Sequence, residues 1–348
     1  MKYDLTVLED YVNRGLLLKQ THPTMPLSIY NYTRNCTWEK KWDEITLNAR
    51  GLILDNRGNV VAHPFPKFFN MEELNGIGLE IPNEPFDVYS KMDGSLLILF
   101  HYEGQWHTAS RGSFTSEYAI KGAELLKNYP IELLYTTQTY CFELLWKERI
   151  IVLSPKKDDV IMLGAFVTET GEEMNIHQSY YTKNFNVVKR YDGLSDYTKL
   201  KQIITDDMEG FVIRFKSGFR MKIKGENYCR LHNIITGISS IDIWEHLKEG
   251  RDITDLLENV PDEFDQWVKN KIKELENKFT LEWETVVDLY NKIYKTYGNS
   301  LPDKKIFSDE LKKLDKKYQG VLFNMYDERP VDSIIWKYIR PVHEKPQF

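Results

Sequence analysis

The pattern of apolar and polar positions changes about two thirds of the way along this 348-residue chain. Between about residues 27 and 225, short runs of β-branched and aromatic residues alternate with turns that contain Gly, Asn, Asp and Pro, which is typical of β-strands. Two helices interrupt this region, at 116–126 and around 197–204. We expect the strands at 27–32, 50–55, 60–65, 86–91, 95–102, 105–110, 139–146, 149–154, 160–167, 209–215 and 219–224.

The last third of the chain has a helical pattern. Over 262–297 the apolar residues recur at steps of three and four, which predicts one long amphipathic helix. Pro261 lies near its expected start, where a missing N–H costs little, and Gly298 follows its expected end. Further helices are expected at 304–317 and 330–339.

This change of pattern predicts two domains, an α+β domain at 1–235 and an all-α domain at 236–348. The second domain is expected to dock on the first, because Trp244 and Trp336 offer more apolar surface than one helix can cover.

Composition excludes several classes of protein. Hydrophobic residues make up 42% and charged residues 28%, as in ordinary globular proteins, and no apolar run is long enough to span a membrane. The acidic start of the chain does not resemble a signal peptide. Three widely spaced cysteines form neither a disulfide framework nor a metal-binding spacing, which favours a reducing compartment, the cytoplasm, or the host cytoplasm for a viral protein. A net charge of −6 disfavours a protein that coats nucleic acid but allows a local basic cleft.

The strongest local signal for chemistry is the segment Lys-Met-Asp-Gly-Ser at 91–95, directly before an apolar strand. The Asp-Gly pair predicts a tight turn that displays Lys91 at a rigid strand end. A lysine becomes a nucleophile only without its proton, and lowering its pKa to about 7.5 costs roughly 4 kcal/mol, which burial or neighbouring cations can supply. The alternative is an ordinary surface lysine beside a hairpin turn.

A basic hairpin follows at 209–224. Strand alternation places Arg220, Lys222 and Lys224 on one face, where three cations repel one another unless an anion lies between them. A triphosphate is such an anion, although an exposed basic edge that prevents aggregation would show the same pattern. Two carboxylates, Glu143 and Glu209, are embedded in apolar strands, where a charge needs a cation, a metal or a ligand hydroxyl.

Taken in order, these segments resemble the covalent nucleotidyltransferase superfamily of ATP-dependent ligases and mRNA capping enzymes. Within it, the chain is similar to the RNA ligase 1 family of the T-even bacteriophage type over about residues 29–232. The superfamily resemblance rests on the segments 91–94, 110–112, 142–143, 209–211 and 222–224. The family resemblance rests on the segments 29–32, 49–51, 66–70, 91–95, 149–153 and 222–224, the last followed by Tyr228.

The resemblance implies a fold, an activity and partners. The fold would be α+β, with a nucleotidyltransferase (ATP-grasp-like ligase) domain of antiparallel sheets followed by an all-α C-terminal domain that supports RNA choice. The activity would be ATP-dependent RNA ligation through lysyl-AMP, with ATP and Mg²⁺ or Mn²⁺ as cofactors. The partners would be RNA with 5′-phosphate and 3′-hydroxyl ends, broken tRNA being one candidate. The protein is expected to act as a monomer, without a membrane.

The resemblance also implies roles for individual residues. Lys91 would attack the α-phosphate of ATP, and Glu209 would orient both the lysine and the metal. Glu143 would contact the ribose or metal-bound water, and Tyr228 would act in the RNA steps. The residues implied around the nucleotide are Arg50, Lys67, Lys222 and Lys224 at the phosphates, Arg111 near the ribose, Tyr30 near the nucleotide and Phe69 against the base, with Asp252 as a third metal ligand beside Glu143 and Glu209.

Three alternatives remain open at this point. An mRNA-capping guanylyltransferase uses the same lysine with GTP, but it and a DNA ligase would carry an OB-fold domain in place of the helical region. A non-enzymatic protein that binds RNA ends could retain a decayed site. Labelling with ATP or GTP would separate these possibilities.

Overall fold

The computed structural model describes residues 2–149, 152–251, 260 and 262–345. Within these residues the chain divides into two compact units, Met1–Cys229 and Arg230–Phe348. The sequence pattern placed this division slightly later, at 235/236. The helix α6 (Glu226–Gly237) contains the point at which the units are separated.

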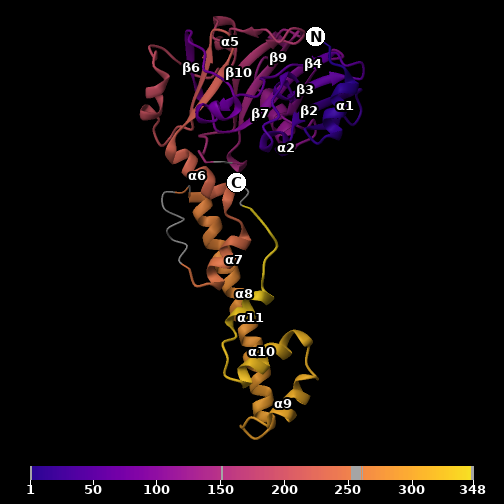
Figure 1. The fold of residues 1–348 in the computed structure, drawn as a ribbon, viewed down its shortest axis with the longest axis vertical. Helices are drawn as coiled ribbons and strands as arrows, with labels where there is room; N and C mark the ends of the chain where they lie inside the picture. Colours follow the sequence, from indigo (N-terminus) through magenta and orange to yellow (C-terminus); the bar gives the residue numbers. More distant parts are fainter. Residues whose placement is uncertain (1, 150–151, 252–259, 261, 346–348) are drawn as a thin grey trace. The chain divides into compact units, whose positions relative to one another are not determined.

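The first unit is built on three sheets, drawn in Figure 1. Neighbouring strands are antiparallel, except for β14 and β5, which pair in parallel. The first sheet has the order β1 (Leu17–Thr21), β2 (Leu27–Tyr32), β3 (Arg50–Asp55) and β4 (Val60–Ala62). The second has the order β11 (Glu173–Met174), β10 (Asp159–Val167), β9 (Gln138–Leu145), β7 (Ser95–Tyr102) and β8 (Gln105–Ser110). The third has the order β12 (Arg190–Tyr191), β6 (Phe86–Lys91), β13 (Gly210–Phe215), β14 (Arg220–Lys224) and β5 (Phe69–Asn70).

Short helices connect and cover these sheets. They are α1 (Leu5–Asn13), α2 (Arg34–Trp38), α3 (Glu44–Asn48), α4 (Glu117–Leu126) and α5 (Ser179–Asn184), with 3₁₀ turns at Met71–Glu73, Asn75–Ile77, Ile131–Leu133, Lys147–Arg149 and Tyr197–Ile203. The side chain of Ser116 caps α4 by accepting a hydrogen bond from the amide of Ala119.

Alternation along the strands directs apolar side chains into separate cores. In the third sheet, Met221 and Ile223 of β14 are buried, whereas the basic residues between them are only partly buried. The second sheet buries Leu97, Phe142 and Met162 in another core. The third sheet therefore has one apolar face and leaves polar side chains on the other. The first and second sheets bury apolar side chains on both faces, as Leu97 and Ile98 of β7 belong to different cores.

The second unit is helical, as the sequence pattern predicts. Its elements are α7 (Ser240–Lys248), α8 (Asp262–Thr296), α9 (Lys304–Leu311), α10 (Lys316–Tyr326) and α11 (Asp332–Tyr338). The indole N–H of Trp244 donates to the carbonyl oxygen of Trp336 at 2.8 Å, and the ring of Phe279 stacks on Trp336. Both tryptophans therefore have partners within this unit, and its docking on the first unit stays a prediction. No helix among the described residues is long and apolar enough to cross a membrane.

Two expected elements differ from the structure. The strand predicted at 149–154 is wrong for the residues described there, because Lys147–Arg149 is a 3₁₀ turn, 152–153 form a bend and 154 is irregular. The amides of Val152 and Leu153 donate hydrogen bonds to the side chain of Asp93 instead of to a neighbouring strand. The single helix predicted at 304–317 is interrupted: α9 ends at Leu311, and a second helix, α10, begins at Lys316. The side chain of Asp315 caps the start of α10 by accepting a hydrogen bond from the amide of Lys317.

Candidate active site

Many of the expected site residues lie on one face of the third sheet. They form three rows that run across β6, β13 and β14. The register of the strands creates these rows, since residues two apart on a strand share a face. The rows are Lys91–Gly210–Lys224, Tyr89–Val212–Lys222 and Asp87–Arg214–Arg220.

In the first row, one carboxylate bridges two lysines. Glu209 immediately precedes β13; its Oε2 lies 2.8 Å from Nζ of Lys91 and its Oε1 lies 2.9 Å from Nζ of Lys224. The side chain of Glu209 is only 3% exposed, so its charge is compensated chiefly by these two cations. Gly210 follows at φ +147°, and a Cβ there would lie 2.0 Å from the carbonyl oxygen of Ile223. The Glu-Gly pair is needed because only glycine lets the strands approach closely enough beside the carboxylate.

The turn after Lys91 is held from three directions. Oδ2 of Asp93 accepts hydrogen bonds from the amides of Val152 and Leu153, at 3.0 and 2.8 Å. Its Oδ1 accepts one from the hydroxyl of Tyr228 at 2.7 Å. Burial and the negative charges of Glu209 and Asp93 raise the pKa of Tyr228, which keeps its proton on the hydroxyl. These bonds position the strand end that presents Lys91.

Gly94 completes the turn and places it against the second sheet. A Cβ at Gly94 would lie 2.4 Å from the carbonyl oxygen of Leu144 and 3.0 Å from Cγ of Glu143. The glycine therefore allows β9 to bring Glu143 close to Lys91. Burial raises the pKa of Glu143 to about 7. Lys91 and Arg50 lower this pKa, but the nearby carboxylates of Glu209 and Asp93 offset part of that lowering.

Lys222, in the second row, has no ion-pair partner among the residues that the structure describes. Its pKa is lowered to about 7 by burial and by the neighbouring charges of Lys67, Lys91 and Lys224. Its Nζ lies 6.0 Å from the ring centre of Phe68. Lys67 lies above the rings of Tyr32, Trp42 and Phe69, at 5.4, 5.6 and 4.8 Å. Two partly buried lysines close together favour binding of an anion such as a phosphate.

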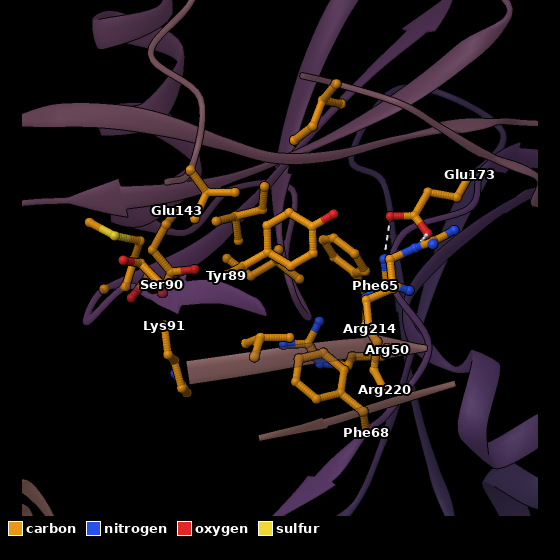
Figure 2. A pocket seen from close by; sticks show the side chains of 18 of the residues that line it. Arg50, Phe65, Phe68, Tyr89, Ser90, Lys91, Glu143, Glu173, Arg214 and Arg220 are labelled. Atoms are coloured by element: carbon orange, nitrogen blue, oxygen red, sulfur yellow. Dashed lines mark hydrogen bonds and ion pairs between the residues drawn. The ribbon is translucent and has the colours of Figure 1, made fainter. Parts of the chain in front are cut away.

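These elements border a cavity of about 660 Å³, which Figure 2 shows from close by. Lys91 and Glu143 lie on one side of this view, and Glu173, Arg214 and Arg220 lie on the other. The size and the mixed lining suit a small ligand of nucleotide dimensions.

Three buried polar atoms in the cavity wall have no hydrogen-bond partner among the described residues. They are Oδ1 of Asn31, Nη1 of Arg50 and Nε2 of His177. Burial lowers the pKa of Arg50, whose guanidinium lies 5.8 Å from the ring centre of Phe68. Buried polar groups are nearly always satisfied in folded proteins, so unsatisfied ones in one cavity indicate a ligand-binding surface.

The third row lines the cavity, with Arg214 and Arg220 on the side opposite Lys91 in Figure 2. Arg214 Nε lies 2.6 Å from Oε2 of Glu173, and Arg220 pairs with the other oxygen of the same carboxylate (Figure 2). Glu173 belongs to β11 of the second sheet, so this ion pair connects two sheets. The alternation that places Arg220, Lys222 and Lys224 on one face is therefore confirmed. The anion beside Arg220, however, is a protein carboxylate.

The structure brings most of the expected residues together. Lys91, Glu143, Arg50 and Arg111 line the cavity, and the guanidinium of Arg111 lies 5.6 Å from the ring centre of Tyr32. Glu209, Lys224 and Tyr228 surround Lys91, while Lys67 and Lys222 lie near Phe68 and Phe69. Asp252, the expected third metal ligand, lies outside the described residues.

Two expectations for the nucleotide need correction. Tyr30 is 1% exposed and packs in the core of the first sheet, and Phe69 is 4% exposed and packs in the core of the third. Their neighbours Asn31 and Phe68 line the cavity instead. The physical reason is the period of a strand, because a shift of one residue moves a side chain to the opposite face.

The expected metal ligands are only partly available. Both oxygens of Glu209 bind lysines, and among the described residues no group of three or more His, Cys, Asp or Glu side chains could hold a metal ion. Glu143 remains as a carboxylate that lines the cavity. A Mg²⁺ ion typically binds one or two carboxylates together with substrate phosphates, which this arrangement allows.

Several residues of the site were not found from the sequence. Tyr89 and Asp87 could have been found, since they lie two and four residues before Lys91 on the same strand face. No sequence pattern indicates that Glu173 and His177 belong to the site. Only the packing of β11 beside the third sheet brings these two residues to the cavity.

Comparisons with known proteins agree with this geometry. The model of the RNA ligase family, in its T4 RNA ligase 1 type, matches residues 48–228. The chain is similar to a protein of Autographa californica nuclear polyhedrosis virus that is named as a bifunctional polynucleotide kinase/RNA ligase, at 28% identity over 59% of this chain and 33% of that one. It is also similar to an RNA ligase of Rhodothermus phage RM378, at 24% identity over 61% of this chain and 65% of that one. The chain thus spans between one third and two thirds of the length of these relatives.

Among solved structures, an archaeal ATP-dependent RNA ligase superimposes with a TM-score of 0.51 at 14% identity. The match covers 78% of this chain and 76% of the archaeal chain, which shows a shared fold.

Proposed function

The chain belongs to the RNA ligase family of the T4 RNA ligase 1 type, and on that premise we propose that it is an ATP-dependent ligase that joins RNA ends. The family predicted from the sequence motifs is confirmed by the match over residues 48–228. The observation that carries the proposal is Lys91, which lines a cavity and is bridged through Glu209 to Lys224.

In the first step, the uncharged amine of Lys91 attacks the α-phosphorus of ATP. The new N–P bond replaces the bond to pyrophosphate, which leaves with both of its phosphates. Glu209, 2.8 Å from Nζ, accepts the proton that the amine must lose and then stabilises Lys224 through its other oxygen. Lys222 on β14 and Lys67, two residues before β5, hold the departing phosphates.

Two further steps use RNA. A 5′-phosphate oxygen attacks the phosphorus of the lysyl-AMP, which returns Lys91 to its free form and gives an adenylated RNA end. A 3′-hydroxyl then attacks the 5′-phosphate, and AMP leaves. Glu143, with a pKa of about 7, lies where it can accept the proton of a hydroxyl group near the adenylate.

A divalent cation supplies charge neutralisation at the phosphates in this proposal. Glu143 is the residue that would hold it together with ATP oxygens, since both oxygens of Glu209 bind lysines. Mg²⁺ and Mn²⁺ both suit a site of this kind. The helical unit selects among RNA ends, broken tRNA included, and the protein acts as a monomer.

The test is intact-mass analysis of the full chain after incubation with ATP and Mg²⁺. One added AMP is expected for the natural chain and none for Lys91→Ala or Lys91→Arg. A second assay follows ring closure of a 5′-phosphorylated RNA with a 3′-hydroxyl. AMP on the Lys91→Ala variant would refute the assignment, and transfer of GMP in place of AMP would indicate a capping-type enzyme.

A further inference from the structure

We propose that the edge of the nucleobase is bound by Nε2 of His177, a residue that stacks on Tyr89 in the wall of the cavity. This inference rests on the proposed function, because it assumes that the α-phosphate is held at Lys91. His177 is then the residue that distinguishes one purine from another.

The position of the base follows from the strand that carries Lys91. Tyr89 lies two residues before Lys91 on the same face of β6, about 6.6 Å away along the strand. In a nucleoside monophosphate, the base is one sugar ring away from the phosphate. A nucleotide that is bonded to Lys91 and fills the cavity therefore brings its base to Tyr89. Figure 2 shows Tyr89 between Lys91 on one side and Glu173 on the other.

The cavity beside Tyr89 has an apolar lining that suits a flat ring. Val212 pairs across the strand with Tyr89, and Leu163 approaches from the second sheet. Leu163 lies at a bulge in β10, where the register shifts between Met162 and Gly164. The bulge directs its side chain into the cavity. A purine between these residues would bury much of its apolar surface.

His177 supplies a polar atom at this end. Its ring stacks on that of Tyr89, with the centres 5.5 Å apart and the planes at 25°. Nε2 is buried in the cavity wall and has no hydrogen-bond partner among the residues that the structure describes. Burial lowers the pKa of His177, so the imidazole is neutral at pH 7 and can donate one hydrogen bond and accept another.

The charged groups nearby are already paired. Arg214 and Arg220 share Glu173, and Arg190 lies 3.5 Å from Asp192. The hydroxyl of Ser90 lies 3.1 Å from that of Tyr191. Because these groups are engaged by protein partners, Nε2 of His177, which lies beside Tyr89, is left as an unsatisfied polar atom that a base can bind. A purine presents ring nitrogens as acceptors and, in adenine, an amino group as a donor.

The experiment compares the full chain with His177→Phe, which keeps a stacked ring but removes both nitrogens. Self-adenylation is measured by intact mass with ATP, with purine riboside triphosphate, which lacks the 6-amino group, and with 1-deaza- and 7-deaza-ATP. The natural chain should use at least one of these analogues with a KM about tenfold above that for ATP. His177→Phe should show a KM for ATP raised by the same factor and should no longer distinguish that analogue, while kcat stays within about threefold.

Two controls separate this role from a structural one. His107→Phe is the matched variant, because His107 also stacks on an aromatic ring, Phe100, but does not line the cavity. It should leave all KM values unchanged. His177→Gln places an amide nitrogen near the position of Nε2 and should recover part of the affinity for ATP, which a merely structural histidine would not predict.

The inference would be overturned if the natural chain used all three analogues as well as ATP, or if His177→Phe kept the same discrimination. An unchanged KM for ATP in a folded His177→Phe variant would also refute it. Failure of the proposed function is distinct, because the natural chain would then form no adenylate with any nucleotide.

Discussion

Two carboxylates beside the third sheet each bridge two cations, yet they differ in the cations that they hold. Glu209 binds Lys91 and Lys224, all three from the third sheet and its edge. Glu173 binds Arg214 and Arg220 and belongs to the second sheet. The same arrangement of charge therefore occurs once within a sheet and once between two sheets.

The difference lies in the chemistry of lysine and arginine. A lysine can lose its proton and act as a nucleophile, whereas an arginine stays charged and binds a carboxylate with a rigid fork. The lysine pair is 20–23% exposed, so both amines remain accessible to a substrate. The arginine pair joins two sheets in the wall of the cavity. We conclude that Glu209 serves the reaction and that Glu173 serves the shape of the cavity.

The largest effect is expected from exchanging these carboxylates for amides. Glu209→Gln should reduce the rate of self-adenylation about a thousandfold, because Lys91 and Lys224 lose their shared anion. Glu173→Gln should leave kcat within a few-fold but lower the free energy of unfolding by about 3 kcal/mol, since two arginines remain unpaired. Single-turnover kinetics and chemical unfolding measure the two quantities. The prediction is contradicted if Glu173→Gln slows self-adenylation strongly while the free energy of unfolding stays unchanged.

Lys222 lies between the two bridged ends and should have the next largest effect. Lys222→Ala should slow self-adenylation about a hundredfold, because it removes a preorganised charge at the phosphates. With a pKa of about 7, Lys222 loses its charge as the pH rises, so the affinity for ATP should fall by up to about tenfold between pH 7 and 8.

Lys222→Arg provides the control, since arginine stays charged. Its affinity for ATP should be nearly independent of pH over the same interval, as measured by calorimetric titration with a non-hydrolysable ATP analogue. An unchanged pH dependence in Lys222→Arg would show that another group titrates.

A smaller effect is expected at Tyr228, which supports the lysine end through Asp93. Tyr228→Phe removes one of three hydrogen bonds to Asp93 and leaves the two from the amides of Val152 and Leu153. Self-adenylation should slow about tenfold, the lower end of the range for one hydrogen bond to a charged group. Asp93→Ala is the comparison and should cost more, because it removes all three bonds. Equal rates for Tyr228→Phe and the natural chain would confine Tyr228 to the RNA steps.

The smallest effect on adenylation is expected from removing the helical unit. A chain that ends after Gly237 keeps α6 and Tyr228 but omits α7, whose Trp244 is buried against Trp336. It should self-adenylate within about twofold of the full chain and lose selectivity among RNA ends. Circular dichroism checks that the shortened chain is folded. A folded but inactive chain would place part of the active site in the helical unit.

Much of this protein is determined by local sequence. The strands at 27–32, 50–55, 86–91 and 95–102 have the predicted bounds, because alternating apolar residues and strong turn residues define them without help from distant parts of the chain. The same holds for the Asp-Gly turn after Lys91 and for the basic face of β14. Each depends only on the period of a strand and on the conformational preferences of a few residues.

Tertiary structure decided which side chains meet. Whether Phe68 or Phe69 faces the cavity depends on how the two-residue strand β5 pairs with β14, and a segment that short has no pattern of its own. The segment around Val152 and Leu153 has the apolar pattern of a strand. Its amides instead donate hydrogen bonds to Asp93, which lies 59 and 60 positions earlier in the sequence. Glu173 and His177 reach the cavity only because β11 pairs at the edge of the second sheet. Their contacts are made across long separations in sequence, where the free energy of packing, and no local preference, selects the partner.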